Sequence, residues 1–172
     1  MNDQIETIVN IELKKLVPFR DHPFQVRDDD EMRMLTESVS SVGVLVPAIV
    51  GPIEDGQYEI IAGHRRHYAS GIAGLSTIPC IVRDVDRDTA TVMMVDSNFQ
   101  REEILPSERA KAYQMKLNAI KRQGARTDLT SDQVGQKLVR KSSRDLIAEN
   151  SPDSSSQIQR YLRLNALLPE LL

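Results

Sequence analysis

The chain has 172 residues, of which 40% are hydrophobic and 27% charged, so it is long enough for one domain or two small ones with a real core. Eight glycines and eight prolines exclude a collagen-like or low-complexity chain. The sequence has no apolar stretch of membrane-spanning length and no signal-peptide pattern, so we expect a cytoplasmic protein without a membrane partner. A single cysteine, Cys80, excludes an internal disulfide.

The charge is divided unevenly along the chain, although the formal net charge is only -3. Residues 1–100 hold nine Lys and Arg against sixteen Asp and Glu, whereas residues 101–172 hold thirteen against nine. The basic excess is concentrated between Lys116 and Arg144. Such an excess is typical of a surface that binds a polyanion, but lysines and arginines also decorate ordinary solvated helices. Charge alone leaves both interpretations open.

The first part of the chain alternates strand and helix patterns. In chain order we expect a strand over 8–17, a loop over 20–30, a helix over 30–43, strands over 44–53 and 57–62, a helix over 67–73, a strand over 78–83 and a helix over 87–98. Asp55-Gly56 predicts a hairpin between the second and third strands, and Gly43 has the position of a C-cap. These patterns predict a small mixed α/β domain.

After Pro106 the pattern becomes wholly helical. Helices are expected over 108–123 (ending at Gly124), 130–139, 143–149 and 157–165. Ser155 or Ser156 is the expected N-cap of the last helix. Two short helices around a tight turn predict helix-turn-helix geometry. The fold class is therefore α+β, with a boundary near residues 101–107.

Gly63-His64-Arg65-Arg66 follows a strand and opens a helix. Free N–H groups and the positive end of the helix dipole form an anion site at such a position. Glycine permits close approach of the backbone and guanidinium groups match phosphate oxygens, so a nucleoside triphosphate fits this chemistry. The alternative is a surface turn with two solvated arginines.

The segment Asn98-Phe99-Gln100-Arg101-Glu102 is a second polar cluster, expected at a helix end. Asn98 or Glu102 is able to ligate Mg²⁺, and Arg101 is able to pair with a phosphate oxygen; the alternative is a polar hinge. Walker and dinucleotide glycine motifs are absent from the sequence, which argues against a P-loop ATPase or a Rossmann enzyme.

The histidines and the cysteine give weaker signals. His64 and His67 lie one helical turn apart, but no carboxylate or cysteine is spaced with them to complete a metal site. Cys80 lies in an apolar strand, where we expect a buried and inert thiol. The acidic run at residues 28–31 either repels DNA or begins the helix, and we favour the second because carboxylates stabilise a helix N-terminus.

Six segments together resemble the ParB family of chromosome and plasmid partition proteins, which are CTP-dependent DNA clamps. They are residues 22–27 (HPFQVR), 43–50 (GVLVPAIV), 63–69 (GHRRHYA), 97–102 (SNFQRE), 105–110 (LPSERA) and the helix-turn-helix region 145–168. Their order and spacing agree with those of the family, and the resemblance covers nearly the whole chain.

The resemblance implies a CTP-binding ParB/sulfiredoxin-like domain over residues 1–104 and a helical DNA-binding domain over residues 105–172. The implied nucleotide-binding residues are Gln25, Arg27, Pro47, Gly63, His64, Arg65, Arg66, Asn98, Gln100 and Arg101. The implied Mg²⁺ ligands are Asn98 and Glu102. The implied DNA-binding residues are Lys137, Arg140, Lys141, Arg144, Ser155, Ser156, Gln157, Gln159, Arg160 and Arg163. The implied partners are a centromere-like double-stranded DNA site, a second copy of the chain and a ParA-like ATPase.

Three departures from the family pattern matter. Ser97 stands where the family usually has a glutamate implicated in hydrolysis, so we expect nucleotide binding with slow or absent turnover. In the phosphate motif, His64 stands where the family usually has a glutamate, and Tyr68 stands where it often has an arginine. These two changes leave the choice of nucleotide open. Family members usually continue into a C-terminal dimerisation domain, which this sequence does not contain, so we expect a fragment that dimerises only with ligand.

Two other functions stay open. One is a simple sequence-specific DNA-binding repressor or plasmid-control protein without nucleotide gating, which Ser97 favours. The other is a small-molecule phosphotransferase, because sulfiredoxins and free-serine kinases share the phosphate turn. The predicted helix-turn-helix argues against the phosphotransferase.

Overall fold

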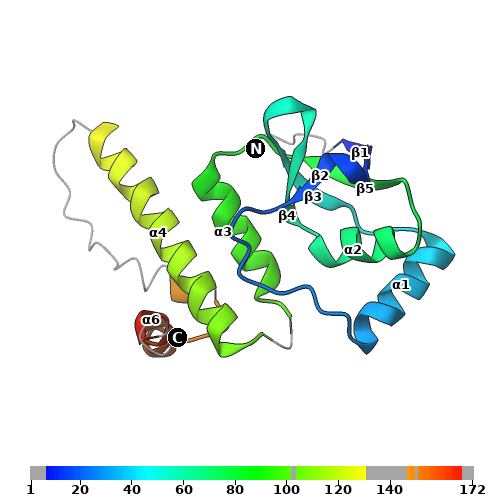
Figure 1. The fold of residues 1–172 in the computed structure, drawn as a ribbon. Coiled ribbons are helices and arrows are strands. Elements are labelled where there is room, and N and C mark those ends of the chain that lie inside the picture. The colour runs from blue at the N-terminus through cyan, green and yellow to red at the C-terminus, as the bar shows by residue number, and fades with distance from the viewer. Residues whose placement is uncertain (1–6, 102–103, 131–146, 150, 168–172) are drawn as a thin grey trace. The chain divides into compact units, whose positions relative to one another are not determined.

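The computed structural model describes residues 7–101, 104–130, 147–149 and 151–167 (Figure 1). The chain forms two compact units, Met1–Val85 and Asp86–Leu172. Helix α3 thus belongs to the second unit, whereas the sequence places the domain boundary near residues 101–107, and that boundary stays a prediction. Along the described ranges, none of the helices combines the length and apolar character that a membrane crossing requires.

The first unit is built on a five-stranded mixed sheet, which confirms the predicted α/β character of this region. Its strands are β1 (Ile8–Glu12), β2 (Leu16–Pro18), β3 (Ala48–Pro52), β4 (Tyr58–Ala62) and β5 (Thr77–Val82). They lie in the order β1-β5-β3-β4-β2. β1 and β5 are antiparallel, as are β3 and β4, whereas β3 runs parallel to β5 and β2 parallel to β4. The predicted hairpin is the β3–β4 pair, closed by the 3₁₀ helix η2 (Glu54–Gly56).

The prediction of one continuous strand over residues 8–17 was wrong. A 3₁₀ helix, η1 (Leu13–Lys15), separates β1 from β2, and these two strands form opposite edges of the sheet. The Leu13 N–H donates to the Ser76 carbonyl at 3.0 Å at this break. Ile11 and Leu16 lie on either side of the break and enter the same core. The apolar pattern of the sequence therefore continues through the turn and gives no sign of the break.

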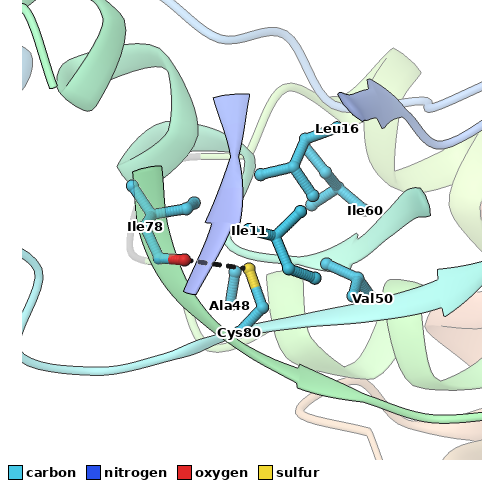
Figure 2. Packing of buried hydrophobic residues seen from close by; sticks show 7 residues of the cluster. All are labelled: Ile11, Leu16, Ala48, Val50, Ile60, Ile78 and Cys80. Atoms are coloured by element: carbon cyan, nitrogen blue, oxygen red, sulfur yellow. Dashed lines mark hydrogen bonds between the residues drawn. The ribbon is translucent and has the colours of Figure 1, made fainter. Parts of the chain in front are cut away.

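Seven buried side chains form the core of the sheet (Figure 2). They are Ile11, Leu16, Ala48, Val50, Ile60, Ile78 and Cys80. The Cys80 thiol is fully buried among them and points at the Ile78 carbonyl, 3.5 Å away. Burial raises the pKa of Cys80 to about 11, so the thiol stays protonated at neutral pH. The expectation of a buried, inert cysteine is confirmed.

Helices α1 (Asp30–Val42) and α2 (His64–Ile72) pack against each other in the first unit. Asp29 caps α1, because its Oδ1 accepts the Met32 N–H at 2.8 Å, and Gly43 ends the helix with φ +75°. The acidic residues therefore begin a helix, as predicted. α2 begins at His64, three residues before the predicted start, because Gly63 supplies a left-handed N-cap.

The second unit is helical. It contains α3 (Arg87–Asn98), α4 (Pro106–Thr130) and α6 (Ser155–Leu167), and α4 packs against both of the others. The predicted end of α4 at Gly124 was wrong, since the helix continues through that residue. Glycine in a helix interior costs only about 1 kcal/mol relative to alanine, too little to stop a helix held by packing. The predicted helix over 130–139 and most of the one over 143–149 lie outside the described residues.

Two ion pairs join α3 to α4. Lys116 Nζ lies 2.5 Å from Asp96, with the lysine side chain only 2% exposed. Arg122 lies 2.6 Å from Asp88, which is itself buried. Lys116 belongs to the stretch predicted to hold a polyanion, but burial and pairing remove it from any such surface. The lysine instead links α4 to α3.

Candidate functional site

Gly63 forms the turn between β4 and α2, and its position requires glycine for two reasons. Its φ of +112° is unfavourable for residues with a side chain. A Cβ atom there would lie 3.0 Å from the Ala48 Cβ and 3.2 Å from the Ala48 Cα. The turn therefore lies directly against β3, with the first N–H groups of α2 lacking carbonyl partners within their helix. We call residues 63–66 the Gly63 turn.

The Arg66 side chain folds inward onto the segment that precedes β3. Its Nη1 donates to the Val46 carbonyl at 2.5 Å and to the Pro47 carbonyl at 2.7 Å. Burial lowers the pKa of Arg66, although a guanidinium remains charged at neutral pH. Arg66 thus joins the Gly63 turn to residues 43–47, and it brings Pro47, another predicted nucleotide-binding residue, to the same place.

Arg65 points in a different direction, toward the start of α1. Its Nη1 lies 2.8 Å from Glu31 Oε2, and its Nη2 lies 3.5 Å from Asp29 Oδ1. The Arg65 side chain is 24% exposed and Glu31 is 68% exposed. The two arginines of one motif therefore have different partners: main-chain carbonyls for Arg66 and carboxylates for Arg65.

His64 lies inside the unit. Its Nε2 accepts the Phe19 N–H at 3.2 Å, and its ring stacks on that of His22 with 3.8 Å between the centroids. Burial, with smaller contributions from His22 and His67, lowers the pKa of His64 to about 3. The ring is neutral at physiological pH, so it adds no positive charge to the Gly63 turn. That His64 contacts a nucleotide stays a prediction, and any such contact would be made by a neutral ring.

The loop over residues 19–29 carries Gln25, which is exposed, and Arg27, which is half-buried. Phe19 and Phe24 anchor this loop, each only 2% exposed, and the bond from Phe19 to His64 ties it to the Gly63 turn. The first unit therefore gathers the 19–29 loop, residues 43–47 and the Gly63 turn around the N-terminus of α2. Three of the segments predicted from sequence to bind a nucleotide are connected here by direct contacts.

The remaining predicted nucleotide residues belong to the second unit. The Asn98 amide nitrogen donates to the Met94 carbonyl at 2.8 Å, which fixes the side chain against its own helix. Gln100 is exposed and Arg101 is half-buried, and Glu102 lies outside the described residues. Among the residues that the structure describes, His, Cys, Asp and Glu nowhere gather in threes to form a metal site. Mg²⁺ bound mainly through phosphate oxygens needs only one or two protein ligands, and an Asn98 amide oxygen suits it.

Helix α6 carries the described part of the predicted DNA-binding set. Ser156, Gln157, Arg160 and Arg163 are exposed, whereas Ser155 and Gln159 are half-buried. The N-cap is Ser154 and not Ser155 or Ser156: the Ser154 N–H donates to Gln157 Oε1 at 2.9 Å, and the Gln157 N–H donates to Ser154 Oγ at 3.3 Å. This reciprocal capping box fixes the start of α6. Lys137, Arg140, Lys141 and Arg144 lie outside the described residues.

A buried polar network that the sequence did not predict holds the turn before α6 against α4. The Tyr113 hydroxyl donates to Asp153 Oδ2 at 2.6 Å, and Arg109 pairs with the same carboxylate at 2.8 Å. Burial raises the pKa of Tyr113, which keeps the hydroxyl a donor. Asp153 lies 40 residues after Tyr113, so no local pattern reveals the pair.

The sequence matches the ParB N-terminal domain family over residues 1–99. The chain belongs to this family. The resemblance inferred from its motifs is thereby confirmed for the N-terminal part, while the helix-turn-helix stays a prediction.

Curated proteins of the ParB family are similar to this chain in sequence. A nucleoid occlusion protein of Geobacillus sp. (strain WCH70) is 38% identical over 109 residues, which are 63% of this chain and 38% of that protein. The chain spans less than half the length of the curated relatives that it matches.

Two crystal structures of the C-terminally truncated chromosome-partitioning protein ParB from Caulobacter crescentus share the fold. The complex with the centromeric parS site has 25% identity and a TM-score of 0.61, covering 95% of this chain and 74% of that one. The complex with CTP-gamma-S has 26% identity and a TM-score of 0.51, covering 96% and 82%.

The buried neutral His64 predicts acid sensitivity of the first unit. Its folded pKa of about 3 lies below the ordinary value of 6.5, so the unfolded chain binds a proton first and stability falls as the pH drops from 6.5 toward 3. At pH 5 the loss from this one group is about 2 kcal/mol. In His64→Gln, the amide oxygen replaces the acceptor for Phe19 without titrating. Urea unfolding at pH 7 and pH 5 should show a smaller pH dependence in the variant, and an equal one would contradict this account.

Proposed function

We propose that this chain binds CTP together with Mg²⁺ and thereby gates its binding to a centromere-like DNA site, as part of a clamp used in chromosome or plasmid partition. The observation that carries the proposal is the Gly63 turn. A Cβ at its glycine would lie 3.0 Å from the Ala48 Cβ, the turn opens helix α2, and it carries two arginines. The family match over residues 1–99 and the CTP-gamma-S complex of the Caulobacter relative support CTP as the ligand.

The roles of the binding residues follow from their surroundings. The N–H groups of the Gly63 turn and the Arg65 guanidinium would bind the phosphates. Arg66, which donates to the Val46 and Pro47 carbonyls, would position residues 43–47 near the base. Gln25 and Arg27 would complete the base side, and His64, Gln100 and Arg101 the phosphate side. Asn98 and Glu102 would hold Mg²⁺, which neutralises phosphate charge when bound.

Nucleotide turnover is a separate matter. The Ser97 hydroxyl donates to the Met94 carbonyl at 2.9 Å and offers no carboxylate to accept a proton from water. We therefore propose that the chain binds CTP with weak or absent hydrolysis. The same serine favours the second candidate function, a DNA-binding repressor or plasmid-control protein without nucleotide gating.

For DNA, α6 would enter the major groove, with its serines, glutamines and arginines contacting bases or phosphates. The exposed Arg160 and Arg163 lie one helical turn apart and are the strongest described candidates for phosphate contacts. Lys137, Arg140, Lys141 and Arg144 would bind the backbone. The parS complex of the Caulobacter relative supports this part.

The proposal also includes two protein partners, a second copy of the chain and a ParA-like ATPase. It places the protein in the cytoplasm, on the nucleoid.

The nucleotide proposal predicts selective binding of CTP. Isothermal titration of the chain with CTP, ATP, GTP and UTP in magnesium buffer should give heat for CTP alone. Arg65→Ala should weaken CTP binding about tenfold or more, because a charge-assisted hydrogen bond to phosphate is lost. Arg65 is a cleaner choice than Arg66, whose removal would also release residues 43–47. A folded protein that binds none of the four nucleotides would favour the repressor without gating.

The DNA proposal predicts that Arg160→Ala/Arg163→Ala weakens binding to a parS duplex. If both side chains contact phosphates, the slope of log K against log salt should fall by about two units in magnitude. Fluorescence anisotropy at several salt concentrations measures this slope. Lys14→Ala/Lys15→Ala removes the same charge from exposed residues of the first unit and serves as the matched control. Equal affinities in the α6 variant and the control would overturn the assignment of α6.

A further inference from the structure

The start of α1 supplies two carboxylates to an arginine of the Gly63 turn. Glu31 Oε2 lies 2.8 Å from Arg65 Nη1, and Asp29 Oδ1 lies 3.5 Å from Arg65 Nη2. The same Asp29 oxygen accepts the Met32 N–H at 2.8 Å, so Asp29 is held in place as the cap of α1. Glu31 has the closer contact with Arg65. Of the two carboxylates, Glu31 is therefore the partner that can exchange without loss of a helix cap.

The exposure of this pair makes it exchangeable. Glu31 is 68% exposed, and an ion pair with so much water around one partner contributes little to stability. Arg66 contrasts with it, because its two carbonyl partners move only if residues 43–47 move. A phosphate that approaches the Gly63 turn would thus meet one arginine bonded to the main chain and one arginine paired with an exposed carboxylate.

We propose that Glu31 is an affinity-setting residue that competes with phosphate for Arg65. This inference rests on the proposed function, since it assigns Arg65 to the phosphates of a nucleotide. Binding of a triphosphate requires Arg65 to exchange the Glu31 carboxylate for a phosphate oxygen. The carboxylate then lies next to a polyanion of the same sign. Glu31 therefore lowers the affinity for any polyphosphate at this turn, independently of the base.

Three variants of α1 test the competition. Glu31→Gln removes the charge, and Glu31→Asp keeps the charge but shortens the side chain by one methylene, which withdraws it from Arg65. Glu37→Gln removes an identical charge from an exposed site farther along the same helix and is the matched control. Titration calorimetry with CTP and with tripolyphosphate, both with magnesium, measures dissociation constants for the wild-type chain and each variant.

The expected result is that Glu31→Gln and Glu31→Asp bind CTP roughly two- to five-fold more tightly than the wild type, the range for one exposed ion pair, with a similar ratio for tripolyphosphate. Glu37→Gln should match the wild type. Equal or weaker CTP binding by Glu31→Gln would overturn the inference. The inference would also be overturned if Glu31→Gln and Glu37→Gln bound CTP more tightly by the same factor while Glu31→Asp bound it like the wild type. That pattern would reflect the net charge of the chain alone. If neither the folded wild type nor any variant binds CTP, the proposed function itself fails.

Discussion

The close approach of Gly63 to Ala48 is the constraint on which the candidate site depends. β4 lies next to β3 in the sheet, and the chain leaves β4 through a residue whose missing Cβ lets the turn lie against its neighbour. That contact places the N-terminus of α2 beside residues 43–47, within reach of the Arg66 side chain. The position of the α2 N-terminus is therefore a consequence of how the turn packs against β3.

Around this turn, two adjacent arginines have unlike surroundings. Arg66 is half-buried and bonded to main-chain carbonyls, so its first role is to hold the neighbouring segment in place. Arg65 reaches two carboxylates near the surface, those of Glu31 and Asp29. His64 between Gly63 and Arg65 is neutral and anchors the 19–29 loop through Phe19. The structure gives these three neighbouring positions different partners: the Phe19 N–H for His64, a carboxylate for Arg65 and a main-chain carbonyl for Arg66.

The sequence predicted what local chemistry determines. The helix over 30–42, with its acidic start and Gly43 at its end, follows from capping and periodicity, and the hairpin follows from Asp55-Gly56. Contacts between residues far apart in the chain could not be predicted from the sequence. The break between β1 and β2 is invisible because Ile11 and Leu16 enter one core, and the pairings of Arg66 and Lys116 join residues about 20 positions apart. The carboxylates that meet Arg65 were seen only as a helix start, because nothing local indicates that α2 packs there.

The most direct test of this account compares two glycines with positive φ in the first unit. An added Cβ at Gly63 would lie 3.0 Å from the Ala48 Cβ, whereas one at Gly74 (φ +74°) meets no atom within 4 Å. Both Gly63→Ala and Gly74→Ala should lower the free energy of unfolding by about 1 to 3 kcal/mol through backbone strain. CTP titration of the two folded variants should then show wild-type affinity for Gly74→Ala and loss of binding for Gly63→Ala. Unchanged CTP affinity in Gly63→Ala would contradict the central claim that the contact with Ala48 creates the site.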